Sequence, residues 1–145
     1  MICIINEYLQ YEVNWSTLHS PTIEVSPTED ISGLIAKLKA VKHALNGVGL
    51  AAPQIGVLKR IAIAQGEVLI NPVITRHGRD VITDLEGCLS TEGHVVRVPR
   101  WRIIDAVWYN EQWERQSGTL YNLAARVFQH ELDHLDGKLI ADLLP

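Results

Sequence analysis

Residues 130–134 read His-Glu-Leu-Asp-His. Two histidines four positions apart lie on one face of a helix, so both imidazoles can reach a single metal ion. The glutamate between them is close enough to handle a proton of a water molecule at that ion. The chain has only 6 His among its 145 residues, so a chance match to this pattern is rare. The stretch therefore predicts a helix that carries a catalytic metal site.

The residues before this motif have the periodicity of an amphipathic helix, which we expect over residues 119–135. At about 100° per residue, Leu123, Val127, His130 and His134 share one stripe, and Glu131 lies within it. The opposite side of this predicted helix carries polar residues, namely Asn122, Arg126, Gln129 and Asp133. Two imidazoles and a carboxylate on a core-facing stripe are costly without partners, and a metal ion would be that partner.

A second helix is predicted near the N-terminus. Ser26-Pro27-Thr28-Glu29 has the pattern of a helix start, an apolar face follows as far as Leu45, and Asn46-Gly47 ends it. The glycine-rich residues 47–56 read as a tight loop without regular structure, and they lack the ending of a phosphate-binding loop. Short β-like runs follow at 60–64, 68–71, 81–85, 95–98, 103–109 and 112–116.

These elements predict an α+β fold with a mixed or antiparallel sheet region, an N-terminal helix and the C-terminal motif helix. The connections between the runs leave little room for crossover helices. We expect residues 1–145 to form one domain. Asp136-Gly137 ends the motif helix, so we expect the chain to be complete without a further C-terminal helix and its last residues, Leu139, Ile140, Leu143 and Leu144, to pack as an apolar tail.

Composition narrows the class of protein. A net charge of −4 gives no electrostatic footprint for nucleic acid. We find no apolar run of transmembrane length and no signal peptide, so no membrane partner is expected. Two cysteines, Cys3 and Cys88, do not make a disulfide framework. A reducing cytoplasm is the expected location, and there Cys88 can serve as a thiolate ligand.

A catalytic metal usually has three protein ligands, so a third is needed beside the two histidines. One large class of metalloproteases has a further histidine six residues after the second, but here Ile140 stands there. No Glu follows residue 134, which argues against the thermolysin-like class. The candidates left open by spacing are Cys3, Cys88, His19, His43, His77, His94, the upstream acidic clusters and, less favourably, Asp136 and Asp142. Cys88 lies in Glu86-Gly87-Cys88-Leu89-Ser90, where it can equally be a small buried hydrophobic residue.

Three segments together resemble the signature motifs of the peptide deformylase family. They are Gly-Val-Gly-Leu-Ala-Ala-Pro-Gln-Ile-Gly at 47–56, Glu-Gly-Cys-Leu-Ser at 86–90 and Gln-His-Glu-Leu-Asp-His at 129–134. Ile70-Asn71-Pro72 is similar to that family as well, and the likeness runs from about residue 18 to 145. The resemblance implies removal of the formyl group from the N-terminal formylmethionine of new polypeptides, with release of formate.

By motif position, the resemblance implies a role for twelve residues. Cys88, His130 and His134 would bind one divalent metal ion, Fe²⁺ in the cell, with Zn²⁺, Ni²⁺ or Co²⁺ able to substitute. Glu131 would be the general base and acid, and the Gln54 side chain and Leu89 backbone N–H would bind the oxyanion. Substrate would be bound by Gly47, Val48, Gly49, Gly87, Leu123 and Val127, the last two lining a methionine pocket.

The resemblance also implies a setting for the protein. Its partners would be N-formylmethionyl nascent chains near the ribosome, and it would act as a monomer in the bacterial cytoplasm, or in that of the host if it is phage-encoded. Thr91-Glu92-Gly93 departs from the apolar residue and proline that usually follow the cysteine motif in the family. Two rival hypotheses are a peptidase and a non-catalytic metal-binding module, and the second would not need Glu131 or Gln54.

Overall fold

A computed structural model describes residues 2–4, 12–88 and 95–143 of the chain. It has three α-helices, nine strands and two 3₁₀ helices within that part. In chain order the elements are β1 Ile2–Ile4, β2 Glu12–Asn14, α1 Trp15–Leu18, α2 Ser32–Ala44, β3 Gly49–Ala51, η1 Ala52–Ile55, β4 Ile61–Ala64, β5 Glu67–His77, β6 Val81–Gly87, β7 Val95–Trp101, β8 Ile103–Tyr109, β9 Arg115–Tyr121, α3 Asn122–Leu135 and η2 Ile140–Leu143.

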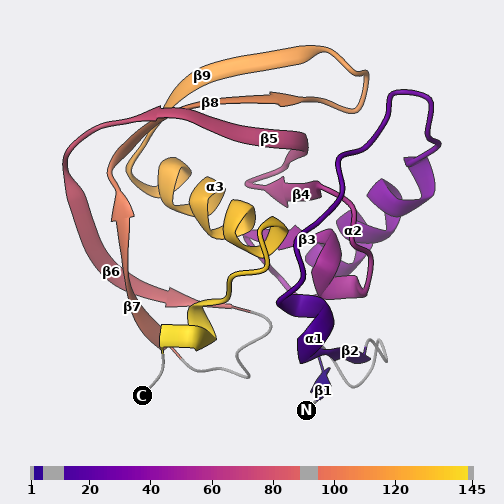
Figure 1. Ribbon diagram of the computed structural model, residues 1–145, viewed down its shortest axis with the longest axis horizontal. Coiled ribbons are helices and arrows are strands. Elements are labelled where there is room, and N and C mark those ends of the chain that lie inside the picture. The colour runs from indigo at the N-terminus through magenta and orange to yellow at the C-terminus, as the bar shows by residue number, and fades with distance from the viewer. Residues whose placement is uncertain (1, 5–11, 89–94, 144–145) are drawn as a thin grey trace.

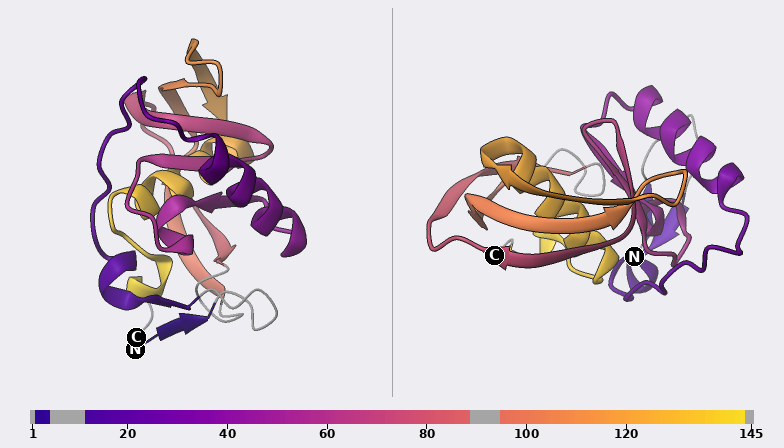
Figure 2. Two further views of the ribbon diagram at one scale, coloured as in Figure 1. Left: turned by 90° about the vertical axis from the view of Figure 1, so that its right-hand side faces the viewer. Right: turned by 90° about the horizontal axis from the view of Figure 1, so that it is seen from above.

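Every pair of neighbouring strands is antiparallel, which confirms the predicted α+β class. The main sheet has the order β3-β4-β5-β8-β9, and β6 pairs with β7. Because β5 leads into β6 and β7 leads into β8, the four strands form one long bent ribbon. Figure 1 shows this ribbon curving around α3, with β5, β8 and β9 above the helix and β6 and β7 to its left. Seen from above in Figure 2, β5, β8 and β9 lie side by side across α3.

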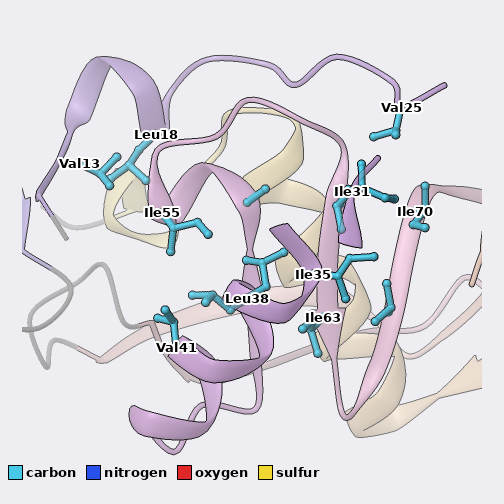
Figure 3. Packing of buried hydrophobic residues seen from close by; sticks show 14 of the residues in the cluster. Val13, Leu18, Val25, Ile31, Ile35, Leu38, Val41, Ile55, Ile63 and Ile70 are labelled. Atoms are coloured by element: carbon cyan, nitrogen blue, oxygen red, sulfur yellow. The ribbon is translucent and has the colours of Figure 1, made fainter. Parts of the chain in front are cut away.

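The main sheet lies between α2 and α3, and the two faces of β4 pack against different helices. Its alternate residues Ile61 and Ile63 belong to the apolar cluster that includes Ile35 and Leu38 of α2. Figure 3 shows Ile35, Leu38, Ile63 and Ile70 gathered in this cluster. On the other face, Ala62 packs with Leu135 of α3. The small alanine side chains let the helix that carries the motif lie close to the sheet.

The predicted helix start at Ser26 is wrong, because α2 begins at Ser32. The hydrogen bonds of the expected cap do form, from Ser26 N to Glu29 Oε1 at 3.1 Å, but they close a separate turn. Asp30 Oδ1 then accepts from the Ser32 N–H at 3.1 Å, and Ile31 is buried in the core before the helix begins. The predicted end is confirmed, since Asn46 has a left-handed φ of 52°.

Several strands are longer than predicted, because residues read as breaks lie inside them. β5 continues past Pro72 through a change of register between Ile70 and Val73, where Asn71 has a φ of 50°. The Asn71 side chain is fixed there by hydrogen bonds of 2.9 Å to the N and O of Val25. Pro99 pairs with Thr83 in the middle of β7.

The strand predicted at 112–116 is misplaced, and the helix predicted from Thr119 begins too early. β9 covers Arg115–Tyr121, so Gly118 lies within it opposite Ala106 of β8. The glycine-rich segment is also more regular than predicted, because it contains β3 and η1. A neighbouring strand explains both differences, because β3 pairs with β4 and β9 pairs with β8. This pairing gives a strand conformation to residues whose own propensity for strand is low.

The stripe predicted on the motif helix is only partly correct. Glu131 and His134 are buried as expected, but Leu123 is 61% exposed. Gln129, predicted to face solvent, is buried and bonds through its side chain to both the N and the O of Trp101. The polar side of α3 therefore faces the β6–β7 hairpin.

The tail after α3 is also mixed. Leu139 and Ile140 are buried, whereas Leu143 is 54% exposed, contrary to the prediction, and Leu144 lies outside the described residues. Among the described residues, no helix is both long and apolar enough to cross a membrane.

Candidate metal centre

Three of the predicted ligands come together. Cys88 Sγ lies 3.2 Å from His134 Nε2, and His134 Nε2 lies 3.2 Å from His130 Nε2. All three donor atoms lie within 4.8 Å of one another. Donors at typical zinc–nitrogen and zinc–sulfur distances in a tetrahedral site are about 3.3–3.5 Å apart. The three residues therefore fit one divalent cation.

Two elements bring these ligands together. Cys88 directly follows Gly87, the last residue of β6, while His130 and His134 lie one turn apart on α3. The other described candidates for the third ligand do not join this group. His19, for example, bonds to Asp142 at 2.8 Å. His94 and the side chain of Cys3 lie outside what the structure describes.

Glu86 also belongs to the site, although neither the motif spacing nor the resemblance implies a role for it. Its Oε1 lies 2.8 Å from His130 Nδ1 and 2.9 Å from Arg100 Nη2. A carboxylate at Nδ1 fixes the proton there and leaves Nε2 free to bind a metal. The signal was present in the sequence: Glu86 lies two residues before Cys88 at the end of a β-like run, and residues two apart in an extended chain point to the same side.

Charge is concentrated around this group. Burial raises the pKa of Glu86, but hydrogen bonds from His130 and Arg100 outweigh it and lower that pKa to about 2. Burial also raises the pKa of the Cys88 thiol, yet the His134 and His130 imidazoles hold it well below its ordinary value. The site thus favours a thiolate at Cys88, the form that binds metal.

Burial acts in the opposite sense on His130. It lowers the pKa of His130, but the contacts with Cys88 and Glu86 prevail and raise it to about 10. The imidazole is therefore held in a region of negative charge that attracts a proton or a metal cation.

Glu131 lies beside the ligands but is not one of the clustered donors. It is 3% exposed, and its Oε2 has no hydrogen-bond partner among the described residues. Burial raises its pKa. A buried carboxyl with a raised pKa can both accept and return a proton near neutral pH.

Gln54 points its amide toward the same place. The side chain is 2% exposed, and its Oε1 accepts from the Ala51 N–H at 2.9 Å. This bond turns Nε2 toward Cys88 Sγ, 3.6 Å away. An N–H donor is thereby oriented at the donor cluster, where an oxyanion could be bound.

The predicted substrate residues are spread around this centre. Gly49 lies in β3, the outer strand of the main sheet, and Gly87 ends β6. The Val48 carbonyl is already used by the Gln65 N–H at 2.9 Å. Val127 packs against the apolar cluster around Phe128, and Leu89 lies outside the described residues. The roles of these residues stay predictions.

A cavity of about 690 Å³ lies elsewhere, lined by the second half of β5, by the β6–β7 hairpin and by the side of α3 that faces this hairpin. Its lining includes Arg76, Trp101 and Asp133 but none of the three clustered ligands. The donor cluster therefore lies outside this cavity.

The geometry agrees with comparisons to known proteins. A family model described as polypeptide deformylase matches residues 6–145. The chain is 36% identical over 137 residues to peptide deformylase 2 of Clostridium perfringens, covering 90% of this chain and 88% of that protein.

Solved structures give the same relationship. The deformylase of Vibrio parahaemolyticus bacteriophage VP16T in complex with actinonin has 36% identity and a TM-score of 0.82, covering 85% of this chain and 93% of that one. The Synechococcus elongatus peptide deformylase in complex with actinonin has 33% identity and a TM-score of 0.83, covering 89% and 76% of the two chains.

Proposed function

The chain belongs to the polypeptide deformylase family, and from this we propose which of its residues carry out the reaction. The protein is a metal-dependent hydrolase that removes the formyl group from N-terminal formylmethionine and releases formate. The observation that supports the proposed site is the convergence of Cys88, His130 and His134, with their donor atoms within 4.8 Å of one another.

We assign metal binding to these three residues. When bound, a divalent cation would lower the pKa of a water ligand to roughly 7, far below that of bulk water, and polarise a carbonyl group. We propose Fe²⁺ as the metal in the cell, with Zn²⁺, Ni²⁺ or Co²⁺ able to substitute, because a thiolate with two imidazoles suits these ions. Metal analysis of protein purified without oxygen tests the identity.

Glu131 handles the protons. It accepts one from the attacking water as the carbon–oxygen bond forms, and it later gives that proton to the departing amine as the carbon–nitrogen bond breaks. Its burial and raised pKa support this role. The products are formate and the free N-terminus of the peptide.

Gln54 stabilises the negative charge on the formyl oxygen. Because Ala51 fixes the side-chain oxygen, the amide N–H is held in place before substrate arrives. We assign the second donor to the Leu89 backbone N–H. The loss of one such donor typically costs about 10²–10³ in rate.

We propose that Gly47, Val48, Gly49 and Gly87 bind the peptide backbone of the substrate. The position of Gly49 in an outer strand and of Gly87 at a strand end supports pairing with an extended chain. Leu123 and Val127 would contact the methionine side chain.

We further propose that residues 1–145 act as one domain and as a monomer. The thiolate ligand suits a reducing cytoplasm, bacterial or that of a phage host, where N-formylmethionyl nascent chains emerge near the ribosome.

Formate release from formyl-Met-Ala-Ser tests the function, with acetyl-Met-Ala-Ser and the unformylated peptide as matched controls. An acetyl group adds a methyl where a site built for formyl is closed by protein. Steric exclusion of the acetyl group should favour the formyl peptide by more than the roughly 1–3 kcal/mol that one methylene contributes to specificity in a deformable hydrophobic pocket. We expect rapid release from the formyl peptide only. Equal rates on formyl and acetyl peptides would refute a closed site, and cleavage of the unformylated peptide would indicate a peptidase.

A further inference from the structure

Arg126 lies one helical turn before His130, and its guanidinium reaches across to the β6–β7 hairpin. Nη1 donates to the Val98 carbonyl oxygen at 2.9 Å and to Glu86 Oε2, and Nη2 donates to the Ile82 carbonyl oxygen. The side chain is 12% exposed. One arginine of the helix therefore holds both strands of the hairpin.

The hairpin and the helix are the two elements that supply the clustered donors. Cys88 follows the hairpin strand β6, and the histidines lie on α3. We propose that Arg126 is a positioning residue: by tying the hairpin to the helix, it sets the distance from Cys88 to the histidines and directs Glu86 onto His130. The inference rests on the proposed metal site and adds to it a residue that touches none of the reacting atoms.

Arg100 does not duplicate this tie. It lies on β7 and holds Glu86 from within the hairpin, by bonds of 3.0 Å and 2.9 Å. Among the contacts of the described residues, it reaches α3 through Asp133, which is 35% exposed. If Arg126 is lost, Arg100 still faces the Glu86 carboxylate. The substitution removes the hydrogen bonds that join two carbonyl groups of the hairpin to the helical turn before His130.

Substitution of Arg126 with methionine keeps an unbranched apolar stem, shorter than that of arginine, and removes the five N–H donors. Arg126→Lys keeps the charge but cannot hold two strands with a planar fork. Arg102→Met is the matched control, because Arg102 also belongs to this ribbon and pairs with Asp80 at 3.2 Å, yet both are solvent-exposed. Each protein is loaded with Co²⁺ alone. The visible spectrum and the rate of cobalt release to a chelator are measured, together with the melting temperature of the metal-free protein.

We expect Arg126→Met to shift the cobalt bands and to release the metal up to about 10–100 times faster than the parent, because loss of the groups that orient metal ligands typically lowers metal affinity by that factor. Arg126→Lys should fall between, and Arg102→Met should match the parent. A lower melting temperature with an unchanged spectrum and release rate would overturn the proposal, because Arg126 would then be only structural. If Arg126→Met does not fold, Arg126→Lys decides by the same two readouts. A parent protein without a cobalt–thiolate band would instead overturn the proposed metal site.

Discussion

Gly49 lies against the carboxylate of Glu131: a Cβ atom built on Gly49 would stand 2.7 Å from Glu131 Oε1 and 2.7 Å from the Ile63 carbonyl oxygen. Real Cβ atoms essentially never come that close to another heavy atom, so the absence of a side chain at residue 49 leaves room for the buried carboxylate. The glycine-rich segment therefore shapes the position of Glu131.

Gly49→Ala should disturb this arrangement. Because one of the two contacts is backbone, the added methyl cannot be accommodated by a side-chain rotation alone. We expect a loss of about 1–3 kcal/mol of stability, as for other overpacked sites, and a fall in kcat. Gly33→Ala is the control, since a Cβ there meets nothing within 4 Å. A kcat equal to that of the parent would show that Glu131 does not depend on this space.

Glu131→Gln tests the proton-handling role. The amide keeps the shape of the side chain but cannot accept the proton, so we expect turnover to fall by about 10²–10⁴ while the bound metal is retained. Metal content and formate release are measured on the same sample. Loss of metal in step with activity would make Glu131 a ligand instead.

Cys88→Ser tests the third ligand. A cobalt–thiolate pair gives a charge-transfer band, which should be present in the cobalt-loaded parent and absent from the variant. The 3.2 Å between Cys88 Sγ and His134 Nε2 motivates the expectation. Survival of the band in Cys88→Ser would assign the thiolate elsewhere.

His19 predicts a pH dependence of stability. Its hydrogen bonds to Asp142 and to the Trp15 carbonyl raise the pKa of His19 above its ordinary 6.5. The contribution of the pair is therefore fully present below pH 6.5 and is lost as the pH rises through the raised value. Because the two side chains are 40% and 46% exposed, the effect should be at most about 1 kcal/mol. Unfolding free energies of the parent and His19→Gln should differ more at about pH 6 than at about pH 9, and a constant difference would contradict the assignment.

The C-terminal segment gives a matched pair of variants. Ile140 packs on Val96 and Val98 of β7, so Ile140→Ala should cost about 2–4 kcal/mol in the free energy of unfolding. Leu143→Ala should cost less than about 0.5 kcal/mol, because Leu143 is 54% exposed. Equal losses in urea unfolding would show that both residues pack.

The sequence predicted the site better than the strands. His130, Glu131 and His134 could be found because the spacing of a helix alone brings them together. Pro72 and Pro99 were misread as breaks, because a change of register and a pairing partner, neither of which is local, keep them within strands. The periodicity of α3 places Arg126 and Gln129 opposite the core-facing stripe, and nothing in it indicates that a hairpin covers this polar face.

The donor set also joins distant parts of the chain, because Cys88 and His134 are 46 positions apart in the sequence. A metal held by both acts as a cross-link, and closing a loop of that size in the unfolded chain removes entropy worth about 4 kcal/mol in the loop-closure model for disulfides. Metal supply should therefore control not only turnover but the lifetime of the fold. Chelation would then lower the melting temperature and leave the metal-free chain more exposed to proteases.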